Sequence, residues 1–241
     1  MCFYNSQSKR ALDLEKRYGR RSDIIEMAQE IIDEQYKVTA FIHPDCPVIT
    51  SSQNIQIAKW GLIPFWVKTE EDAKKISKTT LNARSETVFN LPSFRIPIMS
   101  KRCLIPSSGY FEFHHIGKEA IPYFIFLKDE EIFSLGGIFE IWKNPVSNEI
   151  VKTFTILTVQ ANELCAKIHN SGKNPFRMPL IISKEKEEYW LDASLKSDDI
   201  KQFFLPFDQN RMDAYPVSKD FLKKSPTDST IIELCVMPDC A

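Results

Sequence analysis

The middle of the chain consists of short apolar runs rich in isoleucine, phenylalanine and valine, and turn-forming residues separate these runs. The runs read NIQIAKWGLIPFW, FRIPIMSKRCLIPSSGYFEF, IPYFIFLKD, EIFSLGGIFEIWK and VKTFTILTVQ. β-Branched and aromatic residues bounded by Pro, Gly, Asn and Lys-Asp turns are typical of strands. This pattern therefore predicts a mainly β structure for the centre of the chain.

Helical periodicity flanks this β region on both sides. Apolar or small residues at positions 24, 28, 31 and 32 predict a helix that begins after Ser22 or Asp23. Further helices are expected within 161–169, 183–193 and 197–206, with a strand at 177–183. No repeat, low-complexity tract or linker interrupts the sequence. We therefore expect one α+β domain that spans residues 1–241.

The charge balance and the cysteine spacing exclude several classes of protein. With 31 basic and 32 acidic residues, the chain has no global positive field, so any contact with nucleic acid must be local. No apolar stretch is long enough to cross a membrane, and the N-terminus does not resemble a signal peptide, which predicts a cytoplasmic protein. The six cysteines show no zinc-type spacing, so we expect reduced thiols and no metal.

The chain begins Met-Cys, and this start is either incidental or chemically important. A small second residue usually permits removal of the initiator methionine, which would leave Cys2 with a free α-amine beside its thiol. Their ordinary pKa values of about 7.7–8.0 and about 8.5 leave both groups partly unprotonated near neutral pH. Such a pair can capture an aldehyde, first as an imine and then as a five-membered thiazolidine.

Two motifs place rigid or charged residues where a strand would otherwise continue. In KWGLIPFW, Trp60 and Trp66 are either core residues or stacking platforms for unpaired bases. In LNARSET, Asn82, Ser85 and Glu86 are explained by a capping turn, whereas Arg84 is suited to bind phosphate through its guanidinium.

Two further motifs carry titratable residues. The alternation in GYFEFH places Glu112 on one strand face with Tyr110 and His114, where it is either a solvated residue or a pocket carboxyl with a raised pKa. His169 ends a predicted helix, so capping by its cation competes with a catalytic role. Arg177 follows shortly after and precedes Met-Pro and an apolar strand.

These motifs, in this order, resemble the SRAP family, the SOS-response-associated peptidases that are described as abasic-site processing proteins. The matching features are Met-Cys, WGLIP at 60–64, NARSET at 82–87, RCLIP and GYFEF within 102–113, GGIFEIW at 136–142, and His169 followed by RMP at 177–179. The resemblance implies the SRAP fold, with a mainly antiparallel, barrel-like β core flanked by helices. It also implies DNA repair as the setting and no cofactor.

The resemblance further implies that Cys2 forms a thiazolidine with the ring-opened sugar of an abasic site in single-stranded DNA. Asn82 would orient the cysteine and the sugar, while Glu112 and His169 would move protons, with donor and acceptor left open. The DNA would be held by Arg84, Arg177, Ser85 and the Trp60 region. The peptidase label would describe self-processing that exposes Cys2, and the family also suggests crosslink reversal and lyase chemistry.

The chain departs from the family pattern at two places. Phe3 and Tyr4 stand where relatives often have Gly-Arg, so one phosphate contact is missing and Tyr4 would stack or hydrogen-bond instead. The link NSGKNPF between His169 and Arg177 is longer than expected. We expect a monomer that associates with the nucleoid when it engages DNA.

Two other functions fit parts of the sequence. An N-terminal-nucleophile amidohydrolase, such as a glutaminase-like domain, also uses a terminal cysteine with its own α-amine as base. A non-covalent single-strand binder would make Cys2 incidental. Low glycine content and the NARSET and RMP motifs argue against the amidohydrolase.

Overall fold

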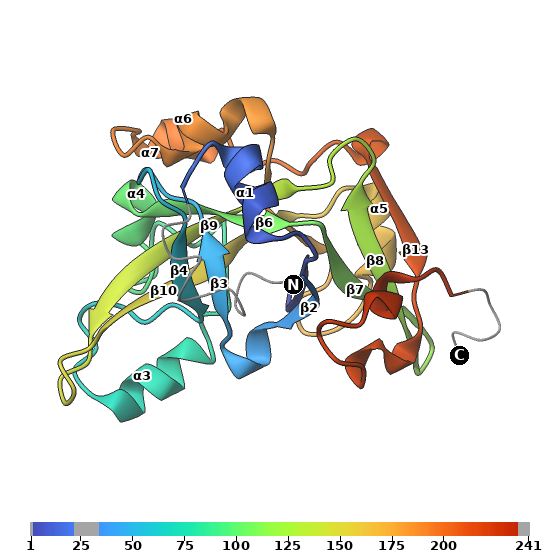
Figure 1. Ribbon diagram of the computed structural model, residues 1–241, viewed down its shortest axis with the longest axis horizontal. Helices are drawn as coiled ribbons and strands as arrows, with labels where there is room; N and C mark the ends of the chain where they lie inside the picture. The colour runs from blue at the N-terminus through green and yellow to red at the C-terminus, as the bar shows by residue number, and fades with distance from the viewer. Residues whose placement is uncertain (1, 22–33, 236–241) are drawn as a thin grey trace.

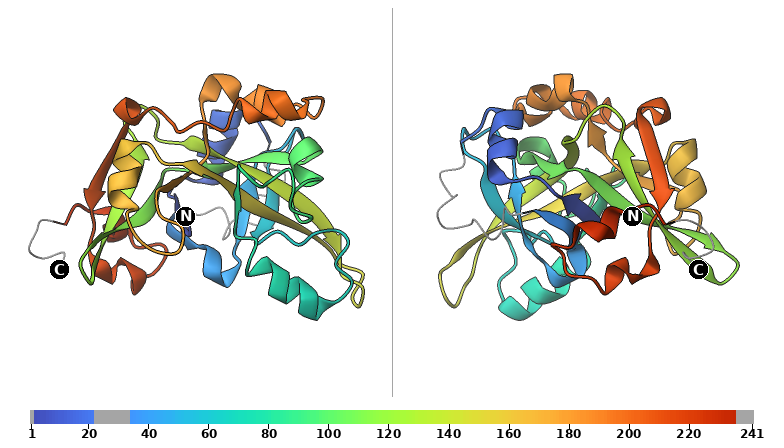
Figure 2. Two further views of the ribbon diagram at one scale, coloured as in Figure 1. Left: turned by 180° about the vertical axis from the view of Figure 1, so that it is seen from behind. Right: turned by 45° about the vertical axis from the view of Figure 1, so that its right-hand side comes forward.

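The structure is a computed structural model of the 241-residue chain that describes residues 2–21 and 34–235. The helix predicted after Ser22 or Asp23 lies outside the described residues. Two sheets form the body of the protein, and helices lie around them (Figures 1 and 2). This arrangement confirms the expected α+β class with mainly antiparallel pairing.

The first sheet has five strands in the order β13-β8-β7-β1-β2. Its members are β1 (Tyr4–Gln7), β2 (Gln35–Thr39), β7 (Gly109–Ile116), β8 (Glu119–Leu127) and β13 (Met212–Pro216). Every pairing in it is antiparallel. Because β1 pairs with β7 on one side and β2 on the other, the chain start is fixed within the sheet rather than at its edge.

The second sheet has eight strands, with the main path β12-β9-β10-β4-β3. Its members are β3 (Asp45–Val48), β4 (Gln56–Trp60), β5 (Asn82–Arg84), β6 (Arg102–Ser107), β9 (Phe133–Lys143), β10 (Ile150–Gln160), β11 (Arg177–Pro179) and β12 (Ile181–Ile182). Strand β10 pairs in parallel with β4 and β5, and antiparallel with β9 and β11. An antiparallel bridge between Ile49, directly after β3, and Leu104 of β6 links the ends of this sheet, since β6 pairs with β9, so the second sheet is strongly curled.

Six α-helices are described: α1 (Ala11–Tyr18), α3 (Glu70–Ser77), α4 (Pro97–Ser100), α5 (Glu163–Ile168), α6 (Glu187–Leu191) and α7 (Ser197–Lys201). Helices α5, α6 and α7 confirm the three C-terminal helix predictions, although each is shorter than its periodic segment. The strand predicted from FRIPIM was wrong, because Pro97 begins the short helix α4 there. Proline suits the first turn of a helix, where its missing N–H is not needed.

Gly61 adopts a conformation that only glycine accommodates easily, with φ of +117° directly after β4. A Cβ at this position would lie 2.6 Å from His43 Nδ1 and 2.9 Å from the Ser77 carbonyl oxygen. We therefore expect Gly61→Ala to lower the free energy of unfolding by about 1–3 kcal/mol through strain and overpacking. Thermal unfolding measures this change. Gly117→Ala is the matched control, because Gly117 has φ of +60° but nothing within 4 Å. Equal losses in both variants would contradict the role of the close contacts.

Candidate functional site

Cys2 lies two residues before β1 and next to Asn82 of β5 in the second sheet. Its side chain is fully buried. The side-chain Nδ2 of Asn82 donates a hydrogen bond to the Cys2 carbonyl oxygen at 3.0 Å. Because β5 is fixed by parallel pairing with β10, Asn82 holds the Cys2 backbone in place. Asn82 Oδ1 is also buried and has no hydrogen-bond partner among the described residues.

Glu112 comes to the same place from β7. Its carboxyl group is buried, and burial raises the pKa of Glu112 to about 7. Burial, and then the negative charge of Glu112, raise the pKa of the Cys2 thiol above its ordinary value. The sequence predicted a thiol partly ionised near neutral pH, and the structure corrects this prediction. The Cys2 thiol stays protonated here and needs a base when it reacts.

His169 follows α5 and faces Glu112, with 3.9 Å between His169 Nε2 and Glu112 Oε2. His169 Nδ1 lies 3.0 Å from the Arg177 carbonyl oxygen. The Arg177 backbone N–H lies 3.2 Å from the same Nδ1. Nδ1 therefore either donates to the carbonyl and leaves Nε2 as an acceptor, or accepts from the N–H and leaves Nε2 as a donor toward Glu112. Burial lowers the pKa of His169 to about 4, so the ring is neutral at pH 7. A neutral ring does not provide the capping imidazolium that a helix end favours.

Arg177 is not available to hold a phosphate in this structure, which corrects the prediction from sequence. Its side chain is buried. The guanidinium donates to both carboxylate oxygens of Glu86, with Nη2 at 2.9 Å from Oε2, and to the Thr158 carbonyl oxygen at 2.6 Å. These bonds engage Nη1 and Nη2, and Nε is buried without a hydrogen-bond partner among the described residues. Arg177 instead fixes the backbone carbonyl that meets His169.

Arg84 and Ser85 of the NARSET motif differ in solvent exposure. Arg84 is exposed and forms no ion pair within the described ranges. Ser85 is buried, and its backbone N–H donates to the Thr158 carbonyl oxygen at 3.0 Å. Of the residues predicted to bind DNA, Arg84 therefore has the most accessible charge.

Trp60 is a core residue, which decides between the two interpretations of KWGLIPFW. It is fully buried, stacks on Phe154 with 5.7 Å between ring centroids, and donates its Nε1 hydrogen to the Leu81 carbonyl oxygen. Its ring therefore has no face open to a base, and the prediction of Trp60 as a DNA contact was wrong. Trp66, in contrast, is 44% exposed.

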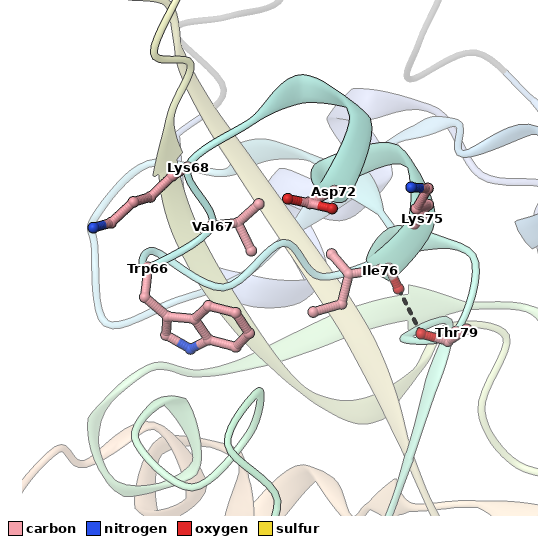
Figure 3. A pocket seen from close by; sticks show the side chains of 7 residues that line it. All are labelled: Trp66, Val67, Lys68, Asp72, Lys75, Ile76 and Thr79. Atoms are coloured by element: carbon pink, nitrogen blue, oxygen red, sulfur yellow. Dashed lines mark hydrogen bonds between the residues drawn. The ribbon is translucent and has the colours of Figure 1, made fainter.

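Trp66 lines a surface pocket of about 620 Å³. Figure 3 shows Trp66, Val67 and Ile76 along its apolar part, with Lys68 and Lys75 toward opposite ends. The indole is therefore an open aromatic face with Lys68 nearby, whereas Lys75 is paired with Glu71 at 2.6 Å and Asp72 also lines the pocket. The sequence predicted such an open aromatic face for Trp60.

The aromatic residues after Cys2 form a half-buried cluster. Tyr4 contacts Phe41, Phe113 and Phe221 at centroid distances of 5.8–6.1 Å. Phe3 lies 5.0 Å from Phe41, whose side chain is 56% exposed. The cluster gives the neighbourhood of Cys2 an apolar character.

Sequence reasoning missed two polar residues near the site. Tyr110 and Cys165 share a hydrogen bond of 3.2 Å between their oxygen and sulfur atoms, and both are buried. Burial is the main cause that raises the pKa of the Tyr110 hydroxyl, and the interaction with Cys165 adds to it. The alternation GYFEFH did place Tyr110 and Glu112 on one face, which was the available signal.

The cysteines and acidic residues show no metal centre within the described residues. Four cysteines are buried free thiols: Cys2, Cys46, Cys103 and Cys165. Cys235 is disulfide-bonded, so the prediction of reduced thiols holds for these four and not for Cys235. In the part of the chain that is described, no helix is long and apolar enough to cross a membrane.

A family model described as SOS response associated peptidase (SRAP) matches residues 1–223. The chain belongs to the SRAP family. The abasic site processing protein YoqW of Bacillus subtilis is 36% identical over 211 residues, which cover 83% of this chain and 89% of YoqW. The abasic site processing protein HMCES of Gallus gallus is 32% identical over 163 residues, which cover 59% of this chain and 46% of HMCES.

Solved structures show the same SRAP fold. A protein from Bacteroides thetaiotaomicron matches with a TM-score of 0.95 and 51% identity, over 98% of this chain and all of that one. A protein from Bordetella bronchiseptica matches with a TM-score of 0.77 at 22% identity, over 90% of this chain and all of that one, which supports the fold alone. In this SRAP chain, the fold gathers Cys2, Asn82, Glu112 and His169 and leaves Trp60 and Arg177 buried.

Proposed function

We propose that this SRAP protein binds abasic sites in single-stranded DNA and attaches to them covalently through Cys2, which shields the lesion during repair. One observation carries the proposal: a buried thiol, an amide that holds its backbone and two groups with strongly shifted pKa values meet at the chain start. Shifted pKa values in one small site are typical of catalytic groups. The names of the curated relatives support the same substrate.

The chemistry requires removal of Met1, which frees the α-amine of Cys2. The closed sugar of the abasic site opens when its ring oxygen gains a proton and its anomeric hydroxyl loses one. The amine then adds to the aldehyde, and water leaves as the imine forms. Finally the sulfur bonds to the imine carbon and a proton reaches the nitrogen. The closed thiazolidine differs from the reactants by one lost water, with no redox change.

The shifted pKa values assign the two proton-transfer roles within this proposal. Glu112 has a pKa of about 7 and so retains a proton in much of the protein at neutral pH, which suits it to protonate the ring oxygen. His169 is neutral at pH 7, and in the tautomer with its proton on Nδ1 the Nε2 atom on the Glu112 side is the proton acceptor in this proposal. Asn82 keeps the Cys2 backbone oriented and has a free carbonyl oxygen to receive the amine or a sugar hydroxyl.

The proposed DNA contacts are few and local, as the net charge of −1 requires. Arg84 binds a phosphate near the lesion, because it is exposed and lies two residues from Asn82 on β5. Trp66 stacks on an unpaired base, with Lys68 close to the backbone. Stacking on an open indole favours single-stranded over paired DNA. We further propose a cytoplasmic protein that joins the nucleoid when it engages DNA.

Arg84→Ala should weaken binding to single-stranded DNA by the same factor for all sequences. The slope of log K against log salt should become shallower by about 0.7, the value for one phosphate contact on a single strand. A salt series followed by fluorescence anisotropy measures this slope. Lys118→Ala is the control, because Lys118 is an exposed cation in the β7–β8 turn. An unchanged slope in Arg84→Ala would contradict the phosphate contact.

Incubation with single-stranded DNA that contains one abasic site tests the proposal directly. An adduct that survives a denaturing gel is expected, together with an intact mass that shows the loss of Met1. The adduct mass should equal protein plus DNA minus one water. Ammonia release from glutamine without an adduct would support the amidohydrolase instead. Binding without any adduct would support a non-covalent single-strand binder.

A further inference from the structure

A second cavity, of about 630 Å³, lies beside the segment that carries Arg84. Its lining includes Ser85, Glu86, Phe89 and Asn90 from that segment, Gln160 from the end of β10, and Phe204 after α7. The cavity is large enough for a planar heterocycle. None of the steps proposed for Cys2 uses it.

Two aromatic rings form its apolar wall. Phe89 and Phe204 face each other at 6.0 Å between centroids, with planes inclined by 46°. Lys201 Nζ lies 5.8 Å from the centre of the Phe89 ring and is paired with Asp198 at 2.8 Å. The pairing offsets the lysine charge, and Glu86, whose carboxylate is paired with Arg177, also lines the cavity. A phosphate would therefore find no unpaired cation among the lining residues.

The polar part of the cavity consists of groups that can both donate and accept hydrogen bonds. The side-chain amides of Asn90 and Gln160 are exposed and bond to no described residue. Primary amides recognise the edges of nucleobases because each offers a donor and an acceptor side by side. Aromatic rings together with open amides are therefore the complement of one unpaired base.

The cavity adjoins the site of Cys2 through β5. Asn82 holds Cys2, Arg84 is exposed two residues later on the same face, and Ser85 already lines the cavity. Strand geometry of about 3.3 Å per residue puts Asn82 and Ser85 about 10 Å apart. Glu86 also lines the cavity and holds Arg177, whose carbonyl meets His169. A strand bound at Cys2 and Arg84 reaches this cavity with a neighbouring nucleotide.

We propose that this cavity binds one unpaired nucleobase of the same DNA strand, a short distance from the abasic site. This inference rests on the proposed function for its substrate. Phe89 and Phe204 supply the stacking surface, and Asn90 and Gln160 bond to the base edge. The cavity thereby sets the strand register and makes the protein sensitive to the bases near the lesion.

The test uses single-stranded oligonucleotides in which a tetrahydrofuran spacer, which has no base and no aldehyde, replaces each nucleotide in turn around the lesion. Non-covalent Kd values are measured by anisotropy with Cys2→Ala protein, alone and combined with Phe89→Leu or Asn90→Ala. We expect one spacer position, distinct from that of the base on Trp66, to weaken binding about fivefold or more, a typical loss for one stacked base. In the proteins that also carry Phe89→Leu or Asn90→Ala, the same spacer should change the Kd by a factor close to one.

Leu12→Ala is the matched control, because Leu12 is 70% exposed on α1 and outside the cavity. It should leave the spacer profile unchanged. The inference is overturned if no second sensitive position exists, or if the sensitive position keeps its full loss in both cavity variants. Adduct formation by the protein with Cys2 intact is measured separately. A normal spacer profile without an adduct would refute the proposed covalent function and leave the base cavity standing.

Discussion

Cys2→Ala should abolish the covalent adduct with abasic single-stranded DNA while leaving non-covalent binding measurable. The alanine variant keeps an α-amine but has no sulfur, so any imine stays open to hydrolysis. A time course on denaturing gels, after loading without reductant, measures the adduct. The expected decrease exceeds a hundredfold, because ring closure by the thiol is what makes the product stable.

Serine and the other thiols provide the controls for Cys2. Cys2→Ser should give an adduct only after borohydride reduction of the imine, which separates the role of the amine from that of the thiol. Cys46→Ser and Cys103→Ser remove buried free thiols elsewhere and should keep the adduct in full. A stable adduct in Cys2→Ala without reductant would sink the proposal, since another nucleophile would then be responsible.

Glu112→Gln should slow adduct formation by about 10²–10⁴-fold, the range expected for loss of general acid–base catalysis. The wild-type rate should depend on pH through two groups. The proton on Glu112 is needed and is lost above a pKa of about 7, whereas the Cys2 amine must be unprotonated and has an ordinary pKa of about 7.7–8.0. The rate follows the product of two fractions, that of protonated Glu112 and that of unprotonated Cys2 amine. This product is largest between about pH 7 and 8 and falls on both sides.

The shape of the profile distinguishes catalysis from a structural role for Glu112. In Glu112→Gln the rate should rise with pH and level off once the amine is unprotonated, without the decline at high pH. Glu149→Gln is the control, because Glu149 is exposed and outside the site. A Glu112→Gln profile that keeps the alkaline decline would refute the proposed donor, as would an unchanged rate.

Much of the fold could be predicted from local patterns. Runs such as IPYFIFLKD and VKTFTILTVQ became β8 and β10, because period and composition act within a few residues. FRIPIM failed because Pro97 starts a helix turn, which its apolar neighbours also permit once they are buried. The parallel pairing of β5 with β10 joins segments about seventy residues apart, and no local pattern specifies it.

The same distinction between local and long-range features applies to the prediction of the site residues. The residue types at Cys2, Asn82, Glu112 and His169 were recognisable, because their chemistry is carried by single side chains in an ordered set of motifs. Trp60 and Arg177 were misjudged, because exposure and ion pairing depend on Phe154 and Glu86, which come from distant parts of the sequence. The direction of the pKa shifts at Cys2 and His169 likewise depends on burial.

The sequence by itself determined the strand-rich α+β class, the order of the motifs and the residues able to capture an aldehyde, since these properties belong to short segments and single side chains. Only the tertiary structure decided that the Cys2 thiol is protonated, that His169 is neutral and that Glu112 titrates near neutral pH. It also decided that Trp66 rather than Trp60 has an open face. The physical reason is that solvent exclusion and long-range pairing set exposure and charge, and both arise only when distant segments meet.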